Sequence, residues 1–251
     1  MKLALVADDA LEPLAGGAAA RRFPSRQQRI VRLAGPALRE AAAGAERGRP
    51  AALFLGLPEP EKEEVALAAG ELMRALAEQS GRAIDEAASQ VFPRGRAAAL
   101  VALDAALRHL GAGRAESVIV GGADTFFDGK LLRRLDREGR VLGARSTDGF
   151  VPGEGAAFIE LSAGRRASAR STGAFATITA LGTATDSGHR YATAPARGEG
   201  LAHALDAMVA SSGPPSRPIA TAYGSMNGES FDAKQWGVAR LRHSRTWDED
   251  E

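Results

Sequence analysis

The stretch Ser117–Leu161 reads SVIVGGADTFFDGKLLRRLDREGRVLGARSTDGFVPGEGAAFIEL and decides the fold of this chain. It opens with Ser117–Val120, whose two valines and one isoleucine predict a short buried strand. Gly121 and Gly122 follow, and glycine lets the backbone turn sharply or approach another backbone closely. We therefore expect the strand to end at this glycine pair.

A helix–loop–strand pattern completes the stretch. Asp128 is a typical helix cap, and leucines at helical spacing follow it until Gly139, a typical helix stop. The next residues, 144–155, are rich in glycine and predict a loop. Residues 156–161 then predict a second strand.

Strand and helix patterns alternate along the rest of the chain. Further strands are predicted at Leu3–Ala7, Ala51–Leu57, Phe175–Gly182 and Ile219–Tyr223. Further helices are predicted at Arg26–Ala43, Glu61–Gln79, Ala97–Leu110, Gly200–Ala210 and Ser230–Arg242. In the helix from Ala97 the expected buried stripe is formed by Leu100, Leu103, Leu107 and Leu110. The alternation predicts an α/β fold whose mostly parallel sheet is covered by helices on both faces.

Composition excludes several classes of function. The 251 residues carry a net charge of +1, so no strong field indicates nucleic acid or an anionic membrane as a partner. The chain has no cysteine, which removes disulfides, thiolate metal sites and thiol nucleophiles together. Asp8 and Asp9 come too early for a signal peptide. We expect a soluble cytoplasmic protein without a membrane span, a metal or a cofactor.

The deciding stretch resembles the β-ketoacyl synthases, the condensing enzymes of fatty-acid and polyketide synthesis. The resemblance rests on a strand followed by GGAD, a short helix, a turn, and then ARSTDGF and GEGA before the last strand. The matching residues are Gly121–Asp124, Asp136–Arg140, Ala144–Phe150 and Gly153–Ala156. So many specified positions in one order are specific for the fold, whereas the family's catalytic residues lie elsewhere.

The resemblance implies a thiolase-like fold built from two similar βαβ halves, usually in a dimer. Residues 1–162 match the N-terminal half, and residues 163–251 match only part of the C-terminal half. We therefore expect the second half to be incomplete, as in a truncated chain. A genuinely short variant is the alternative.

Condensing enzymes use one cysteine, at a strand-to-helix elbow, to carry the acyl chain as a thioester. Counting back from GGAD places Phe92, Pro93 or Arg94 in that position, and none of them can form a thioester. Ser89 lies just outside this slot and would need an adjacent base to accept an acyl group.

The family's first catalytic histidine follows a strand, and here Tyr223 stands in that position. A phenol titrates near pH ~10, so it is a poor base, and packing at a strand end is the more ordinary role. Ser225 is a second hydroxyl nearby. Glu154 in GEGA is a carboxylate near the family's active-site floor, for which a structural role is the alternative.

Two further groups of polar residues are weaker candidates. Asp186, Ser187 and His189 have the residue types of a hydrolytic triad, but neighbours in sequence favour an Asx turn. Two arginine groups could meet the phosphate of a carrier protein's pantetheine arm, or simply form a solvated face. These groups are Arg133, Arg134, Arg137 and Arg140, and Arg165, Arg166 and Arg170.

Two functions remain open. In the first, the protein does not condense and instead pairs, as a homo- or hetero-dimer, with a ketosynthase-like protein, with an acyl carrier protein as a further partner. In the second, it is an acyltransferase or hydrolase of altered chemistry that uses Ser89, Ser225 or Tyr223. A filled slot at Phe92 favours the first.

Overall fold

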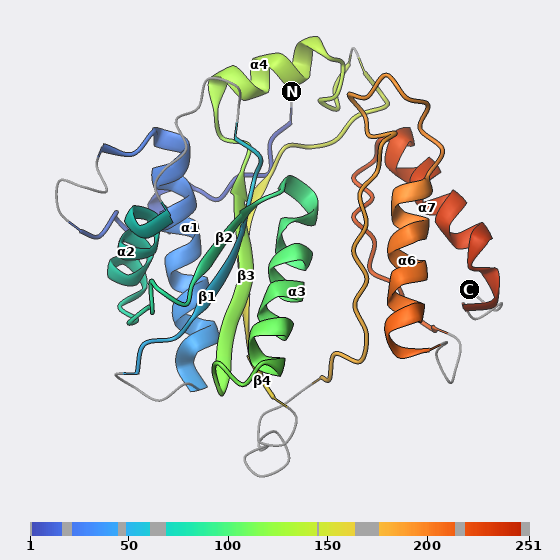
Figure 1. The fold of residues 1–251 in the computed structure, drawn as a ribbon. Helices are drawn as coiled ribbons and strands as arrows, with labels where there is room; N and C mark the ends of the chain where they lie inside the picture. Colours follow the sequence, from blue (N-terminus) through green and yellow to red (C-terminus); the bar gives the residue numbers. More distant parts are fainter. Residues whose placement is uncertain are drawn as a thin grey trace. The chain divides into compact units, whose positions relative to one another are not determined.

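The computed structural model describes residues 2–16, 22–44, 49–60, 69–144, 146–163, 176–213 and 219–246 (Figure 1). The chain divides into two compact units. The sheet unit comprises Leu3–Arg134 and Pro152–Ala174, and the helical unit comprises Met1–Lys2, Leu135–Val151 and Phe175–Glu251. The units therefore interleave in sequence, and a boundary between halves near residue 162 stays a prediction.

Four strands form the sheet in the order β2-β1-β3-β4. They are β1 (Leu53–Leu57), β2 (Gln90–Pro93), β3 (Ser117–Thr125) and β4 (Glu154–Ser162). β1 is parallel to both β2 and β3, and β4 is antiparallel to β3. The predicted α/β sheet, mostly parallel with one antiparallel strand, is confirmed.

Strand β3 does not end where the sequence suggested, because it continues through the glycine pair to Thr125. A Cβ atom on Gly121 would lie only 2.1 Å from the carbonyl oxygen of Ala157 on β4. The glycine therefore permits a close approach between neighbouring strands, which is its second common use in a sheet. The strand end expected at the glycine pair was wrong, whereas the close backbone approach, the other role expected for these glycines, is confirmed.

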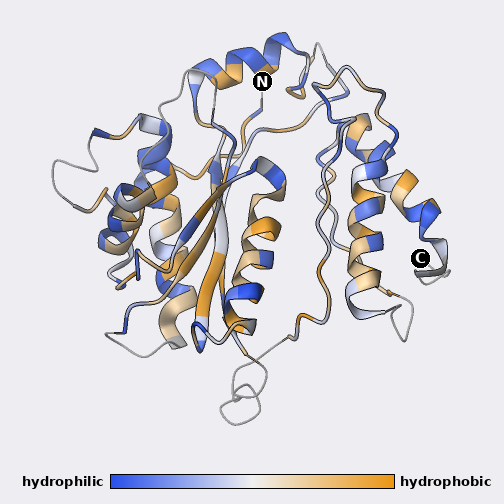
Figure 2. Cartoon of the chain, in the orientation of Figure 1, coloured by the Kyte–Doolittle hydropathy of each residue, from blue (hydrophilic) through white to orange (hydrophobic). Residues whose placement is uncertain are grey.

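Helices cover both faces of the sheet (Figure 1). α1 (Ser25–Ala41) and α2 (Ala69–Ser80) pack on one face around a core that contains Leu38, Leu55, Leu76 and Ile119. α3 (Ala98–Gly111) packs on the other face, over Phe54 and Val120. Figure 2 shows hydrophobic colours along the central strands, as expected for a sheet that is buried on both faces.

Helix α3 buries a different face from the one predicted. Its buried stripe is Ala98, Ala102 and Ala106 with Leu110, whereas Leu100 is 55% exposed. Alanines at this spacing let the helix lie close to the sheet, and a Cβ atom on Gly56 of β1 would lie 2.6 Å from the backbone nitrogen of Ala99. Close packing, rather than side-chain size, therefore sets the orientation of this helix.

Two other predictions for the sheet unit had opposite outcomes. Leu3–Ala7 forms no strand but a single bridge between Ala4 and Gly153, and it is not buried. The cap at Asp128 is confirmed, because its Oδ1 accepts a hydrogen bond from the Leu131 backbone at 2.8 Å at the start of α4 (Gly129–Arg137). Residues 61–68 of the second predicted helix lie outside the described residues.

The helical unit contains α6 (Glu199–Ser212) and α7 (Ser230–Arg242), close to the predicted ranges. The strands predicted at 175–182 and 219–223 were wrong, because residues 176–182 and 219–223 form no strand with any described residue. Short 3-10 helices lie at Asp8–Ala10, Ala42–Gly44, Gly95–Ala97 and Ser244–Thr246. Within the described part of the chain, no helix has the length and apolar character that a membrane span requires.

Candidate functional site

An open pocket of about 480 Å³ lies in the sheet unit, at the ends of β1 and β3 and beside the start of α3. Four short segments line it, and each contains a glycine: Gly56, Gly95, Gly122 and Gly155. Gly95 has a φ of +57°, which a residue with a Cβ atom rarely adopts, and it makes the elbow between β2 and α3. The absence of side chains at these four positions leaves the backbone itself as the wall of the pocket.

Two charged residues, Arg96 and Asp124, belong to this lining, and the other lining residues are glycine, alanine, leucine or proline. Oδ1 of Asp124 accepts hydrogen bonds from Arg26 Nη2 at 3.2 Å and from the Thr125 backbone at 2.7 Å. The amino-terminal end of α3 adds a partial positive charge on the side of Arg96. The pocket can thus hold a slender, partly polar ligand, but its lining offers no hydroxyl, thiol or imidazole group.

The three residues of the predicted nucleophile slot surround the elbow without lining the pocket. Phe92 is half-buried in β2, where its ring stacks on Phe54 at 6.4 Å between centroids. Pro93 ends the strand and is exposed, and Arg94 is exposed in the turn before Gly95. Phe92 therefore packs in the core beneath α3. In this segment of the chain, the residues that line the pocket begin at Gly95.

Sequence reasoning missed Arg96, Asp124 and Gly56 as pocket residues. Asp124 belongs to the GGAD motif, and because the strand was expected to end before this motif, Asp124 was not placed at a strand end. Arg96 lies two positions beyond the predicted slot. The local signal in the sequence was Gly95, because glycine tolerates the positive φ found at this elbow.

The hydroxyl of Ser89 is occupied by the backbone. It accepts a hydrogen bond from the Leu53 N–H at 2.8 Å and donates one to the carbonyl oxygen of Asp85 at 2.6 Å. Leu53 is fully buried at the start of β1. Ser89 therefore ties β1 to the segment before β2, and no base contacts its hydroxyl among the described residues.

We expect Ser89→Ala to lower the free energy of unfolding by about 1–3 kcal/mol, because the buried Leu53 N–H loses its acceptor. Urea denaturation followed by circular dichroism measures this change. Ser225→Ala is the matched control, since Ser225 is exposed and should change stability by less than about 0.5 kcal/mol. Equal effects of the two substitutions would contradict the structural role of Ser89.

The side chain of Glu154 points toward α1 and is fully buried. Its two oxygens accept hydrogen bonds from Arg29 Nε at 2.6 Å and Nη2 at 2.7 Å, from Thr125 Oγ1 at 2.7 Å, and from the Val6 backbone at 2.7 Å. Burial raises the pKa of Glu154, but the bonds from Arg29, Thr125 and Val6 outweigh burial and hold it below its usual value. Glu154 therefore has the structural role that the sequence offered as the alternative, and it joins β4 to α1 and to the segment at Val6.

The two candidate hydroxyl groups of the helical unit, one from a tyrosine and one from a serine, are exposed to solvent. Tyr223 is 99% exposed and Ser225 is exposed, in a segment without a strand. Asp186 forms the predicted Asx turn, because its Oδ1 accepts the Gly188 N–H at 2.8 Å. His189 Nδ1 accepts the Tyr191 N–H at 3.3 Å, so Asp186 and His189 are both bound to local backbone.

The buried carboxylate of Glu229 forms ion pairs with two arginines of the helical unit. Arg140 donates to it through Nε and Nη2, both at 2.9 Å, and Arg190 Nη2 lies 3.1 Å from Oε1. Asn227 Nδ2 donates at 2.8 Å, and Tyr191 OH accepts from Arg140 Nη1 at 2.7 Å. Arg140 thus forms an internal ion pair with Glu229, in contrast to the role predicted for its arginine group, which was to bind phosphate.

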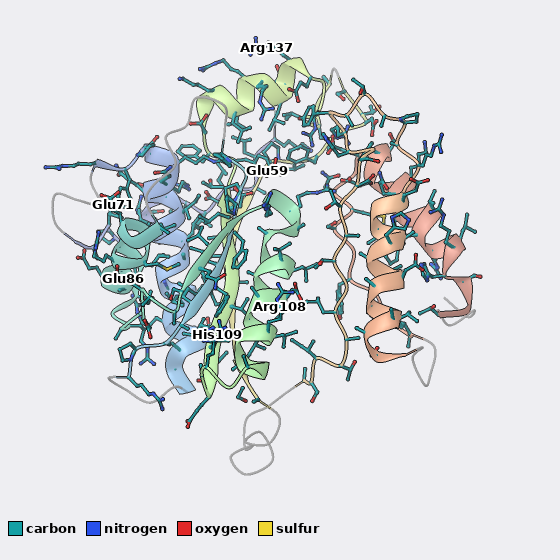
Figure 3. All side chains as sticks on the ribbon, in the orientation of Figure 1. Glu59, Glu71, Glu86, Arg108, His109 and Arg137 are labelled. Carbon is teal, nitrogen blue, oxygen red and sulfur yellow. The ribbon has the colours of Figure 1, made fainter. Side chains whose placement is uncertain are left out.

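Those other arginines lie on α4, which Figure 2 shows as largely hydrophilic. Lys130, Arg133 and Arg137 are exposed and follow one another at helical spacing on one face. Figure 3 labels Arg137 at the carboxyl-terminal end of this helix. The second predicted group, residues 165–170, lies outside the described residues.

Comparison with known proteins finds a similarity to the family that the deciding stretch resembles. The profile of the family "Beta-ketoacyl synthase, N-terminal domain" matches residues 95–167. A search of curated protein sequences finds no match.

Solved structures of ketosynthases share the fold at low identity. The ketosynthase from module 6 of the Bacillus subtilis bacillaene synthase is 15% identical, with a TM-score of 0.69 over 90% of this chain and 41% of its own. A β-ketoacyl synthase from Burkholderia phymatum is 17% identical, with a TM-score of 0.64 over 94% of this chain and 66% of its own. A complex of a type II polyketide-synthase acyl-carrier protein with its ketosynthase is 17% identical, with a TM-score of 0.58 over 70% of this chain and 46% of that one. The chain thus spans less than half the length of the first and the third of these structures.

Proposed function

Since this chain is a β-ketoacyl-synthase-like protein with a thiolase-like ketosynthase fold, we propose that it acts as a non-condensing partner of an active ketosynthase. The observation that carries the proposal is the pocket at the strand-to-helix elbow. Its lining contains backbone, small apolar side chains, Arg96 and Asp124, but no group that can carry an acyl chain. The chain has no cysteine to supply one.

Condensation needs a nucleophile that forms a thioester before the new carbon–carbon bond is made. At the elbow the candidate positions hold Phe92, Pro93 and Arg94, and Phe92 is packed into the core. A fold that keeps its elbow and lacks its nucleophile suits a protein that binds without reacting. The cytoplasmic location expected from the sequence stays a prediction.

The alternative, acyl transfer or hydrolysis through Ser89, Ser225 or Tyr223, has less support. The Ser89 hydroxyl is engaged by the Leu53 and Asp85 backbone, and the other two side chains are exposed. An activated hydroxyl needs a base within hydrogen-bonding reach, and none of the three has one among the described residues.

We further propose that the basic face of α4 receives an acyl carrier protein. Lys130, Arg133 and Arg137 present positive charge on one exposed side of a short helix. An acidic partner surface is complementary to such a face, and the attraction would steer association and weaken with salt. A relative of similar fold was solved in complex with its acyl-carrier protein.

The test is a pull-down with the full chain, followed by intact-mass measurement after incubation with acyl-carrier thioesters. We expect recovery of a cysteine-bearing ketosynthase, binding of carrier protein at low salt but not at high salt, and no change in the mass of this chain. An acyl adduct on the chain, or condensation by the purified chain alone, would refute the proposal.

A gain-of-thiol control makes the negative result interpretable. Because the chain has no cysteine, Arg96→Cys and Arg94→Cys each introduce a single thiol on either side of Gly95. If the pocket admits an acyl thioester, the thiol of Arg96→Cys should be acylated more readily than the thiol of Arg94→Cys. In that case, the absence of an acyl adduct on the parent chain in the same reaction is due to a missing nucleophile and not to a blocked pocket.

A further inference from the structure

The chain contains a single asparagine, Asn227, and the residue that follows it is glycine. An asparagine before glycine loses its side-chain amide more readily than other asparagines, because glycine has no Cβ atom to shield its backbone nitrogen. Asn227 is half-buried, and it lies between the exposed segment 221–226 and the start of α7. The one asparagine of the chain thus stands where the sequence makes this reaction easiest.

The backbone N–H of Gly228 makes no hydrogen bond to any group in the described part of the chain. Gly228 has a φ of +105°, which residues with a Cβ atom rarely adopt. A Cβ atom here would also lie only 3.0 Å from the carbonyl oxygen of Gly149. Backbone conformation and packing therefore both require glycine after Asn227, and they leave its nitrogen without a competing acceptor.

Glu229 contacts both polar atoms of the Asn227 amide. Its backbone N–H donates to Oδ1 at 3.0 Å, and its Oε2 accepts from Nδ2 at 2.8 Å. When the Gly228 nitrogen adds to the side-chain carbonyl, Oδ1 gains negative charge, and Nδ2 gains positive charge as it takes up a proton. The N–H at Oδ1 and the carboxylate at Nδ2 therefore match the two charges of this intermediate.

The carboxylate of Glu229 is held in place before the reaction begins. Its side chain is 1% exposed, and nitrogens of Arg140 and Arg190 lie 2.9 and 3.1 Å from its oxygens. Charged groups that are fixed in advance lower a barrier more than mobile ones, because they do not have to reorganise as charge develops. The fold thus supplies Asn227 with a preorganised environment for the loss of its amide.

We propose that Asn227 is a self-modifying site, at which the folded chain converts the asparagine into aspartate and isoaspartate. The Gly228 nitrogen forms a bond to Cγ of Asn227 and gives up its proton, the Cγ–Nδ2 bond breaks, and ammonia leaves with that proton. Water then adds to either carbonyl group of the resulting succinimide and opens the ring. The net reaction consumes one water molecule and releases one ammonia.

The modification would weaken the helical unit. An aspartate at position 227 lacks the donor that now reaches Glu229, and it places a second carboxylate beside the first. The isoaspartate form also lengthens the backbone by one carbon, shortly before α7 begins. The reaction thus couples the age of a chain to the stability of this unit, and it does not depend on the proposed ketosynthase partnership.

Intact-mass measurement of the full chain at neutral pH follows the reaction, because an OH group replaces an NH₂ group. We expect the folded chain to react at least about tenfold faster than the chain in guanidinium chloride, since one preorganised oxyanion donor contributes about 10²–10³ in enzymes. Asn227→Gln is the control and should keep its mass, because its ring closure is less favourable. Equal or slower reaction of the folded chain, or an equal gain in Asn227→Gln, would overturn the proposal.

Asn227→Asp tests the effect of the product on the helical unit. Its urea midpoint, followed by the fluorescence of Trp236 on α7, should be lower than that of the parent chain, and incubation of the parent should lower its midpoint in the same direction. Ser225→Asp is the matched control, because it adds the same charge at an exposed position of the same segment. Equal midpoints for Asn227→Asp and Ser225→Asp would overturn the coupling of this reaction to stability.

Discussion

Replacing Glu229 by glutamine should destabilise the helical unit by about 3 kcal/mol. The substitution keeps the shape of the side chain but removes the charge that Arg140 and Arg190 share. Breaking a buried ion pair costs about 3–5 kcal/mol, and both guanidinium groups retain some exposure, which favours the lower end. Trp236 lies on α7 in the helical unit, so tryptophan fluorescence during urea unfolding measures this loss.

Glu199→Gln is the matched control within the same unit. Glu199 lies 4.0 Å from Arg242 and is 38% exposed, so its pair should contribute less than about 0.5 kcal/mol. If Glu199→Gln lowered the free energy of unfolding as much as Glu229→Gln, burial would not strengthen the ion pairs of Glu229.

The same carboxylate predicts how stability depends on pH. Burial raises the pKa of Glu229, but hydrogen bonds from Arg140 and Asn227 and the charge of Arg190 hold it below the ordinary 4.5. The unfolded chain therefore binds a proton more readily, so the stabilisation is complete above about pH 4.5 and is lost as the pH falls toward the folded-state pKa. Glu229→Gln should flatten this acid limb when the transition is followed by tryptophan fluorescence.

Replacing Glu154 by glutamine should cost the sheet unit about 3–5 kcal/mol, the largest effect that we expect. The carboxylate has no exposed surface, and Arg29, which holds it with two hydrogen bonds, is itself buried. An amide in its place would turn an NH₂ group toward a donor and leave Arg29 without its buried counter-charge. The circular-dichroism transition in urea should move to a lower concentration.

Glu160→Gln, on the same strand, separates the buried network from a general effect of lost charge. Glu160 is only half-buried and should change stability by less than about 0.5 kcal/mol. If Glu154→Gln lowered stability as little as Glu160→Gln, the pair of Glu154 with Arg29 would be redundant with the ion pairs that Asp8 forms with Arg29 and Arg32.

Local patterns predicted the elements of the sheet unit well. The cap at Asp128 and the stop at Gly139 both follow from residues adjacent in sequence. Helix α7 has the predicted bounds, Ser230–Arg242.

The errors arose where tertiary contacts decide. A glycine pair can turn or can let strands approach, and only the position of Ala157 on β4 selects the second at Gly121. α3 buries its alanines because a close helix–sheet approach outweighs the larger apolar area of Leu100. The segments 176–182 and 219–223 have strand composition, but a strand exists only with a partner.

The site could be predicted only in outline. The spacing to GGAD placed the elbow at Phe92, Pro93 or Arg94, one to three residues before Gly95. The pairing of Arg140 with Glu229 joins residues 89 positions apart, and Arg26 holds Asp124 from 98 positions away. No local pattern in one sequence indicates such distant partners.

The interleaving of the two units has a consequence for synthesis on the ribosome. Arg140 is made 89 residues before Glu229, and at about 5–20 residues per second it waits about 4–18 s for its counter-ion. The strands of the sheet are complete once Ser162 has emerged, so that unit can fold first and hold residues 135–151 tethered at both ends. The nascent chain thus presents an open loop whose arginine can pair within the helical unit only after Glu229 has been made.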